Sequence, residues 1–107
     1  MNITQNTHRR VIRKASSSIC KHRVAAIAFD RSGKLLFVSR NRPQFGRIGG
    51  GIHAEMEIIH RYGKKIKTII IARVSKSGNL LPIHACKKCQ AIADSMNIKI
   101  IPLLELI

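Results

Sequence analysis

The chain has 107 residues, of which 45% are hydrophobic, and this suits one globular domain spanning residues 1–107 around one packed core. No apolar run approaches the roughly 18 residues that a membrane span needs, so a membrane-spanning class is excluded. The 20 Lys and Arg against 5 Asp and Glu give a formal charge of +15, which favours a polyanionic partner such as nucleic acid, a nucleotide or an acidic membrane surface.

The first predicted element is a helix that begins at Thr7, whose side chain can cap it. Its apolar face would consist of Val11, Ile12, Ala15 and Ile19. This segment precedes the first acidic residue, Asp30, and is rich in Arg and Ser, which also fits an organellar transit peptide. We favour the helix because it would cover one face of the sheet formed by the strands that follow.

A β-hairpin is predicted next. Two stretches rich in apolar residues, at 24–29 and 34–39, are typical of strands. The turn at residues 30–33 would join them, with Gly33 at a positive φ. A loop rich in Arg and Gly is expected to occupy residues 40–51.

The second half of the chain alternates helices and strands. The predicted elements are a helix at 52–62 ended by Gly63, a strand at 67–74, a helix at 86–96 ended by Asn97, and a strand at 98–102. The core side of the first of these helices would comprise Ile52, Met56, Ile59 and Tyr62. The order α-β-β-α-β-α-β predicts an α/β fold, namely a three-layer α/β/α sandwich around a central mixed sheet.

Two short segments carry residues typical of a metal site. Cys86 and Cys89 are three residues apart at the start of a predicted helix and can reach one ion, and His53 can supply a third ligand. Three protein ligands leave the fourth position of Zn²⁺ open to water, as in catalytic zinc sites. Glu55 follows His53 by two residues, so it can carry protons between that water and a leaving group.

Two other interpretations of these residues stay open. Cys86 and Cys89 could form a thioredoxin-type redox pair, although this leaves His53 and Glu55 without a role. A structural zinc site could instead be closed by a fourth ligand: His84, Cys20 or His60. The combination of His-x-Glu and Cys-x-x-Cys in this order favours the catalytic site.

The segments His53-Ala54-Glu55 and Cys86-x-x-Cys89 together resemble the zinc signature of cytidine, deoxycytidylate and tRNA-adenosine deaminases. The predicted elements over residues 7–102 are similar to the fold of that superfamily, and Asn41-Arg42-Pro43 resembles a tripeptide of its tRNA-adenosine branch. The chain departs from the pattern at Ala85, where the superfamily usually has Pro. It is also C-terminally short, which would leave one wall of the pocket open to a polymer or to a partner subunit.

The resemblance implies a zinc-dependent hydrolytic deaminase in which Glu55 carries the proton. It further implies that the Ala54 N–H binds the base carbonyl, that the His84 carbonyl accepts from the exocyclic amine, and that Asn41 reaches the sugar or base. From local chemistry alone Asn41 is equally well a turn residue. Phe45 could stack on a base, although an anchoring role in the loop is the simpler interpretation.

We expect the substrate to be the cytosine base of a free nucleoside or nucleotide, of the cytidine, deoxycytidine or dCMP type, with a uracil product and ammonia. The alternatives are the same chemistry on a base within RNA or single-stranded DNA, adenosine included, and a non-catalytic, zinc-stabilised nucleic-acid-binding module. The resemblance implies a homo-oligomer. Three cysteines without a secretory signal favour a reducing compartment, here the cytoplasm.

Overall fold

The computed structural model describes residues 5–18, 23–43, 51–52 and 54–106, with only the backbone described for residues 5, 42–43, 51–52 and 54–57. The elements in chain order are α1 (Gln5–Ser16), β1 (Arg23–Asp30), β2 (Leu35–Arg40), β3 (Arg42–Pro43), β4 (Gly51–Ile52), α2 (Ala54–Tyr62), β5 (Ile66–Val74), β6 (Leu80–Leu81), α3 (Lys87–Ser95) and β7 (Lys99–Pro102). Short 3₁₀ helices follow α2, at Gly63–Lys65, and β7, at Leu103–Leu106.

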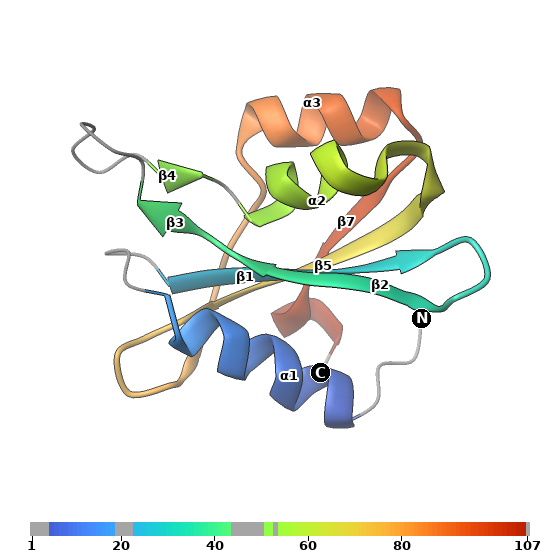
Figure 1. Cartoon of the computed structure of the whole chain (residues 1–107). Coiled ribbons are helices and arrows are strands. Elements are labelled where there is room, and N and C mark those ends of the chain that lie inside the picture. The colour runs from blue at the N-terminus through green and yellow to red at the C-terminus, as the bar shows by residue number, and fades with distance from the viewer. Residues whose placement is uncertain (1–4, 19–22, 44–50, 53, 107) are drawn as a thin grey trace.

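The main sheet is mixed, as the sequence predicts. Its strands lie in the order β2-β1-β5-β6, and β7 also pairs with β5. Strand β1 is antiparallel to both β2 and β5, whereas β7 is parallel to β5. Helix α1 covers one face of the sheet, and α2 and α3 cover the other (Figure 1). The predicted three-layer α/β/α sandwich is therefore confirmed.

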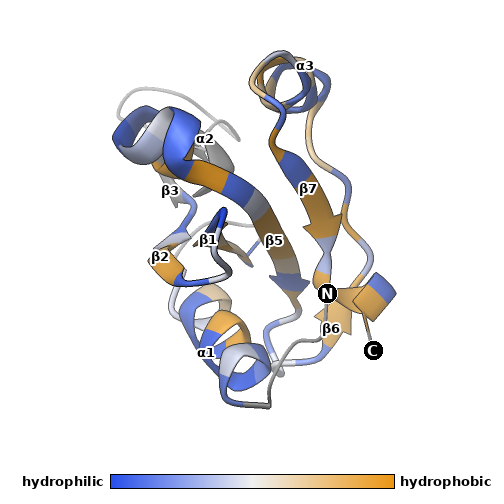
Figure 2. Ribbon diagram, turned by 90° about the vertical axis from the view of Figure 1, so that its right-hand side faces the viewer, coloured by the Kyte–Doolittle hydropathy of each residue, from blue (hydrophilic) through white to orange (hydrophobic). Residues whose placement is uncertain are grey.

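The strands pack on both faces because their side chains alternate. In β1, Ala25 and Ile27 join the cluster beneath α1, whereas Ala26 and Ala28 join the cluster beneath α2 and α3. Strands β5 and β7 are coloured as hydrophobic over most of their length (Figure 2). Each isoleucine that is fully buried in these clusters contributes about 1.5–3 kcal/mol.

A bulge in the hairpin sets the direction of the side chains on β2. Ala28 pairs with Phe37 but Phe29 pairs with Leu35, so Leu36 is the extra residue. As a result Leu35 packs on the α1 side of the sheet, whereas Leu36 and Phe37 pack on the α2 side. The alternation resumes at Val38, which packs on the α1 side.

The predicted hairpin turn is confirmed. Gly33 has φ +88°, and its N–H donates to the Asp30 carbonyl. The Asp30 carboxylate accepts hydrogen bonds from Ser32 Oγ at 2.7 Å, Ser32 N at 2.9 Å and Lys34 N at 2.8 Å. These donors, the Ser32 hydroxyl foremost, lower the pKa of Asp30.

Several predicted boundaries were wrong. Helix α1 begins at Gln5, so Thr7 lies in its first turn and is not its cap. Residues 40–51 are not all loop, because Arg42 pairs with Ile52 between β3 and β4. This pairing places Ile52 in a strand, and α2 begins two residues later, at Ala54.

The remaining helix boundaries agree more closely with the sequence. Gly63, at φ +49°, follows α2 as expected. Helix α3 is capped by Met96, and Asn97 follows it at φ +57° instead of forming the cap itself.

Within the described ranges, no helix has the length and apolar character needed to cross a membrane. The predicted apolar position Ile19 lies outside the described residues.

Candidate functional site

The start of α3 holds the two candidate cysteine ligands. Cys86 is the N-cap of this helix, with extended backbone at φ −64° and ψ 156°, and its sulfur accepts a hydrogen bond of 3.3 Å from the Cys89 N–H. The two sulfur atoms lie 3.0 Å apart. Cys89 is 1% exposed and Cys86 is half-buried. The helix start therefore brings both sulfurs to one point at the edge of the core.

This pair of sulfur atoms fits a soft metal ion. Two sulfurs bound to one tetrahedral zinc ion at about 2.3 Å lie about 3.8 Å apart, so the pair at 3.0 Å is near enough to share an ion once the side chains separate slightly. The N-terminal end of a helix also favours the negative charge that metal-bound thiolates carry. Among the described residues no group of three His, Cys, Asp or Glu side chains forms a complete metal site. The third predicted ligand, His53, lies outside the described residues.

Helix α2 places the other half of the predicted site. Its first two residues are Ala54 and Glu55. As the first helical residue, Ala54 has an N–H without an acceptor inside its own helix, so it is available in principle to an external carbonyl. Helices α2 and α3 touch, and both begin at the same side of the molecule (Figure 1). The first residues of α2 and of α3 thus lie at the same end of the α2–α3 layer.

The layer beneath the site is held by one hydrophobic cluster. Ile58 on α2 and Ala93 on α3 are both fully buried in it, together with Ile69 and Ile71 of β5. Ala85 packs partly buried against the same cluster. The residue before Cys86 is therefore positioned by packing, although it lacks the rigidity that Pro would give.

The predicted substrate-contacting residues meet different surroundings. His84 lies two residues before Cys86 and its side chain is exposed. Phe45 lies outside the described residues. The Asn41 Oδ1 atom accepts hydrogen bonds from Ser18 Oγ at 2.6 Å and from the Val24 N–H at 3.1 Å. The Asn41 side chain therefore links the end of β2 to the start of β1 and to the segment after α1.

Two arginines strengthen the same junction. Arg23 Nη1 donates to the Ser16 carbonyl at 3.2 Å, and Arg40 Nη1 donates to Ser17 at its carbonyl, 3.0 Å, and its hydroxyl, 2.7 Å. The last carbonyls of a helix lack partners within the helix, and basic side chains commonly supply them. That general preference is the only signal by which the sequence could have indicated this arrangement.

Two of the aromatic residues belong to the scaffold. The ring of Phe37 on β2 lies 5.7 Å from that of Tyr62 on α2, at an interplanar angle of 43°. The Arg61 guanidinium lies 4.9 Å from the centroid of the Phe37 ring. These contacts pack β2 against α2. Because the two rings are engaged in them, they are not free to stack on a base.

Comparison with solved structures identifies the architecture. Cytidine deaminase from Mycobacterium tuberculosis superposes with a TM-score of 0.60 at 18% identity, over 92% of this chain and 85% of the other. Cytidine deaminase from Mycobacterium leprae gives a TM-score of 0.60 at 16% identity, over 92% and 87%. No protein-family model and no curated protein matches the sequence. The chain has a cytidine-deaminase-like α/β fold.

Proposed function

We propose that the chain is a single-domain, zinc-dependent deaminase that hydrolyses the cytosine base of a free nucleoside or nucleotide to uracil and ammonia. The observation that carries this proposal is the pair of sulfur atoms 3.0 Å apart at the start of α3, beside the helix that begins with Ala54 and Glu55. The likeness in fold to two mycobacterial cytidine deaminases supports it.

His53, Cys86 and Cys89 would hold the zinc ion, with one coordination position open. When bound, zinc supplies a Lewis acid that lowers the pKa of water to near neutrality. This ligand set distinguishes the proposal from a structural site, which would need a fourth protein ligand. It also gives His53 and Glu55 roles that a redox pair of Cys86 and Cys89 does not.

Glu55 would move the protons of the reaction. It takes a proton from the attacking water and delivers it to the ring nitrogen while the water oxygen forms a bond to the amine-bearing ring carbon. Glu55 then takes the remaining proton of the new hydroxyl and passes it to the amine, the carbon–nitrogen bond breaks as the carbonyl forms, and ammonia leaves. One water is consumed, and the base becomes uracil.

The other predicted contacts would orient the base. The Ala54 N–H donates to the base carbonyl and the His84 carbonyl accepts from the exocyclic amine, so that both edges of the ring are read. Asn41 and Phe45 would contact the sugar or base.

A second candidate function is the same chemistry on a base within RNA or single-stranded DNA, adenosine included, and the net charge of +15 favours it. A zinc-stabilised nucleic-acid-binding module without catalysis is the non-enzymatic alternative. We further propose that the protein acts in the cytoplasm as a homo-oligomer, as is common among such enzymes.

Ammonia release tests these possibilities. The zinc-loaded chain is incubated with cytidine, deoxycytidine, their monophosphates, adenosine, and single-stranded RNA and DNA. Glu55→Gln is compared with Glu57→Gln, which removes an acid two residues further along the same helix. Release that depends on Glu55 but not on Glu57 supports the proposal and names the substrate. No release from any of these with zinc bound would favour the binding module.

A further inference from the structure

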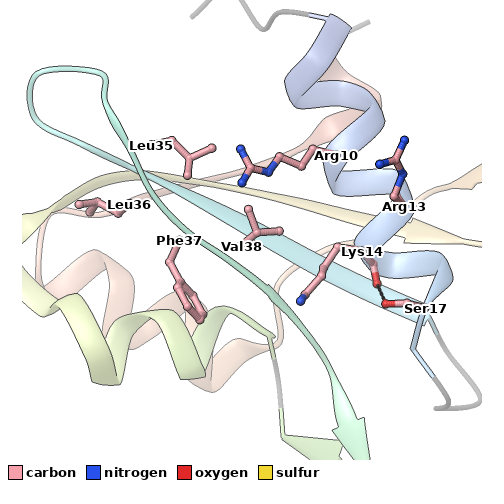
Figure 3. Close-up of a pocket in the computed structure, with 8 residues that line it drawn as sticks. All are labelled: Arg10, Arg13, Lys14, Ser17, Leu35, Leu36, Phe37 and Val38. Carbon is pink, nitrogen blue, oxygen red and sulfur yellow. Dashed lines mark hydrogen bonds between the residues drawn. The ribbon is translucent and has the colours of Figure 1, made fainter.

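A groove runs between α1 and β2 on the side of the sheet opposite to α2 and α3 (Figure 3). Its volume is about 620 Å³. One wall carries Arg10, Arg13 and Lys14 of α1, and the other is residues 35–38 of β2, of which Leu35 and Val38 pack on the α1 side. Arg10 and Lys14 extend toward β2, whereas Arg13 points outward from the helix (Figure 3). The groove is therefore cationic on one side and apolar on the other.

The positive charge of this groove has no acidic counterpart in its walls. Neither α1 nor β2 contains an Asp or Glu. Arg10 and Arg13 are exposed. Arg10 lies three residues from Arg13 and four from Lys14, spacings at which like charges destabilise a helix by about 0.2–0.5 kcal/mol per pair. A bound polyanion would relieve this repulsion.

The apolar wall follows from the bulge in β2. Because Leu36 is the extra residue, Leu35 and Val38 both pack on the α1 side, each partly buried. Phe37 points away from the groove toward α2 (Figure 3). An aliphatic wall beside a row of cations suits a ligand that alternates phosphates with apolar surfaces, as a single nucleic-acid strand does.

One end of the groove lies beside the end of β2. Ser17 lines this end of the groove and accepts a hydrogen bond from Arg40, the last residue of β2. Asn41 follows, and β3 then pairs with β4, which directly precedes α2. A nucleic-acid strand that lies along α1 and β2 would therefore reach the end of β2, where the chain continues into β3.

We propose that the groove between α1 and β2 binds the sugar-phosphate backbone of single-stranded nucleic acid, with Arg10, Arg13 and Lys14 on phosphates. The choice of nucleic acid over an acidic peptide or an anionic membrane rests on the proposed function, since the chemistry of that site acts on a base. The groove extends the substrates of the site from a free nucleoside to a base within a strand.

Binding of a fluorescent 20-nucleotide single-stranded DNA to the zinc-loaded Glu55→Gln chain, measured by anisotropy across a salt series, tests the groove without turnover. The variant Arg10→Gln/Arg13→Gln/Lys14→Gln removes three charges. The matched control, Lys64→Gln/Lys65→Gln/Lys67→Gln, removes three exposed charges, two on the 3₁₀ helix after α2 and one at the start of β5. Three lost phosphate contacts reduce the slope of log K against log salt by about 2.

We expect the groove variant to bind the strand at least about tenfold more weakly, with the reduced salt slope, and the control to change both far less. Equal losses of affinity for the oligonucleotide in the two variants, or no loss in either, would show that the groove is not the binding surface. Arg13 is exposed, so the single variant Arg13→Gln should fold even if the triple variant does not. It should also weaken binding and reduce the salt slope, but by less. Anionic vesicles and polyglutamate are measured in parallel. A groove variant that loses these ligands but keeps the oligonucleotide would also overturn the proposal.

The binding test of the groove and the ammonia-release test of the proposed function can fail independently of each other. If no ammonia is released from any substrate, the anisotropy result still decides whether the groove binds nucleic acid. If cytidine is deaminated, the groove variant keeps this activity, whereas its release of ammonia from the oligonucleotide falls. A groove variant that deaminates the oligonucleotide as fast as the wild type would contradict the link between groove and site.

Discussion

Asn41 accepts a hydrogen bond of 2.6 Å from the hydroxyl of Ser18, 23 residues earlier in the chain. Ser18 is 3% exposed, so the bond lies in a largely buried place. Loss of either partner leaves a poorly solvated polar group, which costs about 1–3 kcal/mol. We expect Asn41→Ala and Ser18→Ala each to lower the free energy of unfolding by that amount. In the double variant the losses should be far from additive. Additive losses in urea unfolding would mean that the two residues act independently.

Cys86→Ser and Cys89→Ser should each abolish stoichiometric zinc binding, measured by elemental analysis of the purified protein. Because metal binding is coupled to folding, both variants should also be less stable than the zinc-loaded wild type. Cys20→Ser is the matched control and should retain zinc. Loss of zinc in Cys20→Ser would instead favour a closed structural site with four protein ligands.

Ile58→Ala should weaken both the fold and the metal site. Ile58 is fully buried in the cluster that α2 and α3 share, and Ile27 is fully buried in the cluster beneath α1. Truncation of either isoleucine should cost about 2–5 kcal/mol. Only Ile58→Ala should also lower zinc affinity, because it disturbs the relative positions of the two helix starts. Equal zinc affinities in Ile58→Ala and Ile27→Ala, by competition with a chelating dye, would contradict this.

The Asp30 turn should contribute to stability in a pH-dependent manner. The pKa of Asp30 is lowered in the folded chain, so its contribution is present above the usual value of 3.8 and is lost as the pH falls through the lower folded value. Asp30→Asn should therefore destabilise the protein at neutral pH and make little difference in strong acid. Ser32→Ala, which removes the principal donor, should shift the acid loss to higher pH. Urea midpoints that differ by the same amount at all pH values would refute this.

The parts of the fold that could be predicted from the sequence are those with a local signal. The β-branched run of β5, the turn at Gly33 and the start of α3 near Cys86 each have a composition that indicates the structure. The two-residue strand β6 has no such signal, because its pairing with Arg73 and Val74 depends on the rest of the sheet. Short pairings of this kind are tertiary contacts and leave no periodicity.

The candidate site was predictable to a similar extent. The spacing of Cys86 and Cys89 implies two sulfurs on one turn, and they lie 3.0 Å apart. The role of Asn41 could not be read from its neighbours, because its partner Ser18 is distant in the sequence. The groove also escaped prediction, since it depends on the bulge that turns Leu35 and Val38 toward α1.

The most direct test of the central claim is the conversion of cytidine to uridine by the zinc-loaded chain in oxygen-labelled water. We expect uridine that carries one labelled oxygen, an equal amount of ammonia, and no product from Glu55→Gln with zinc still bound. Zinc-loaded protein that forms no uridine, or a Glu55→Gln variant that forms it as fast as the wild type, would contradict a cytidine deaminase that uses Glu55.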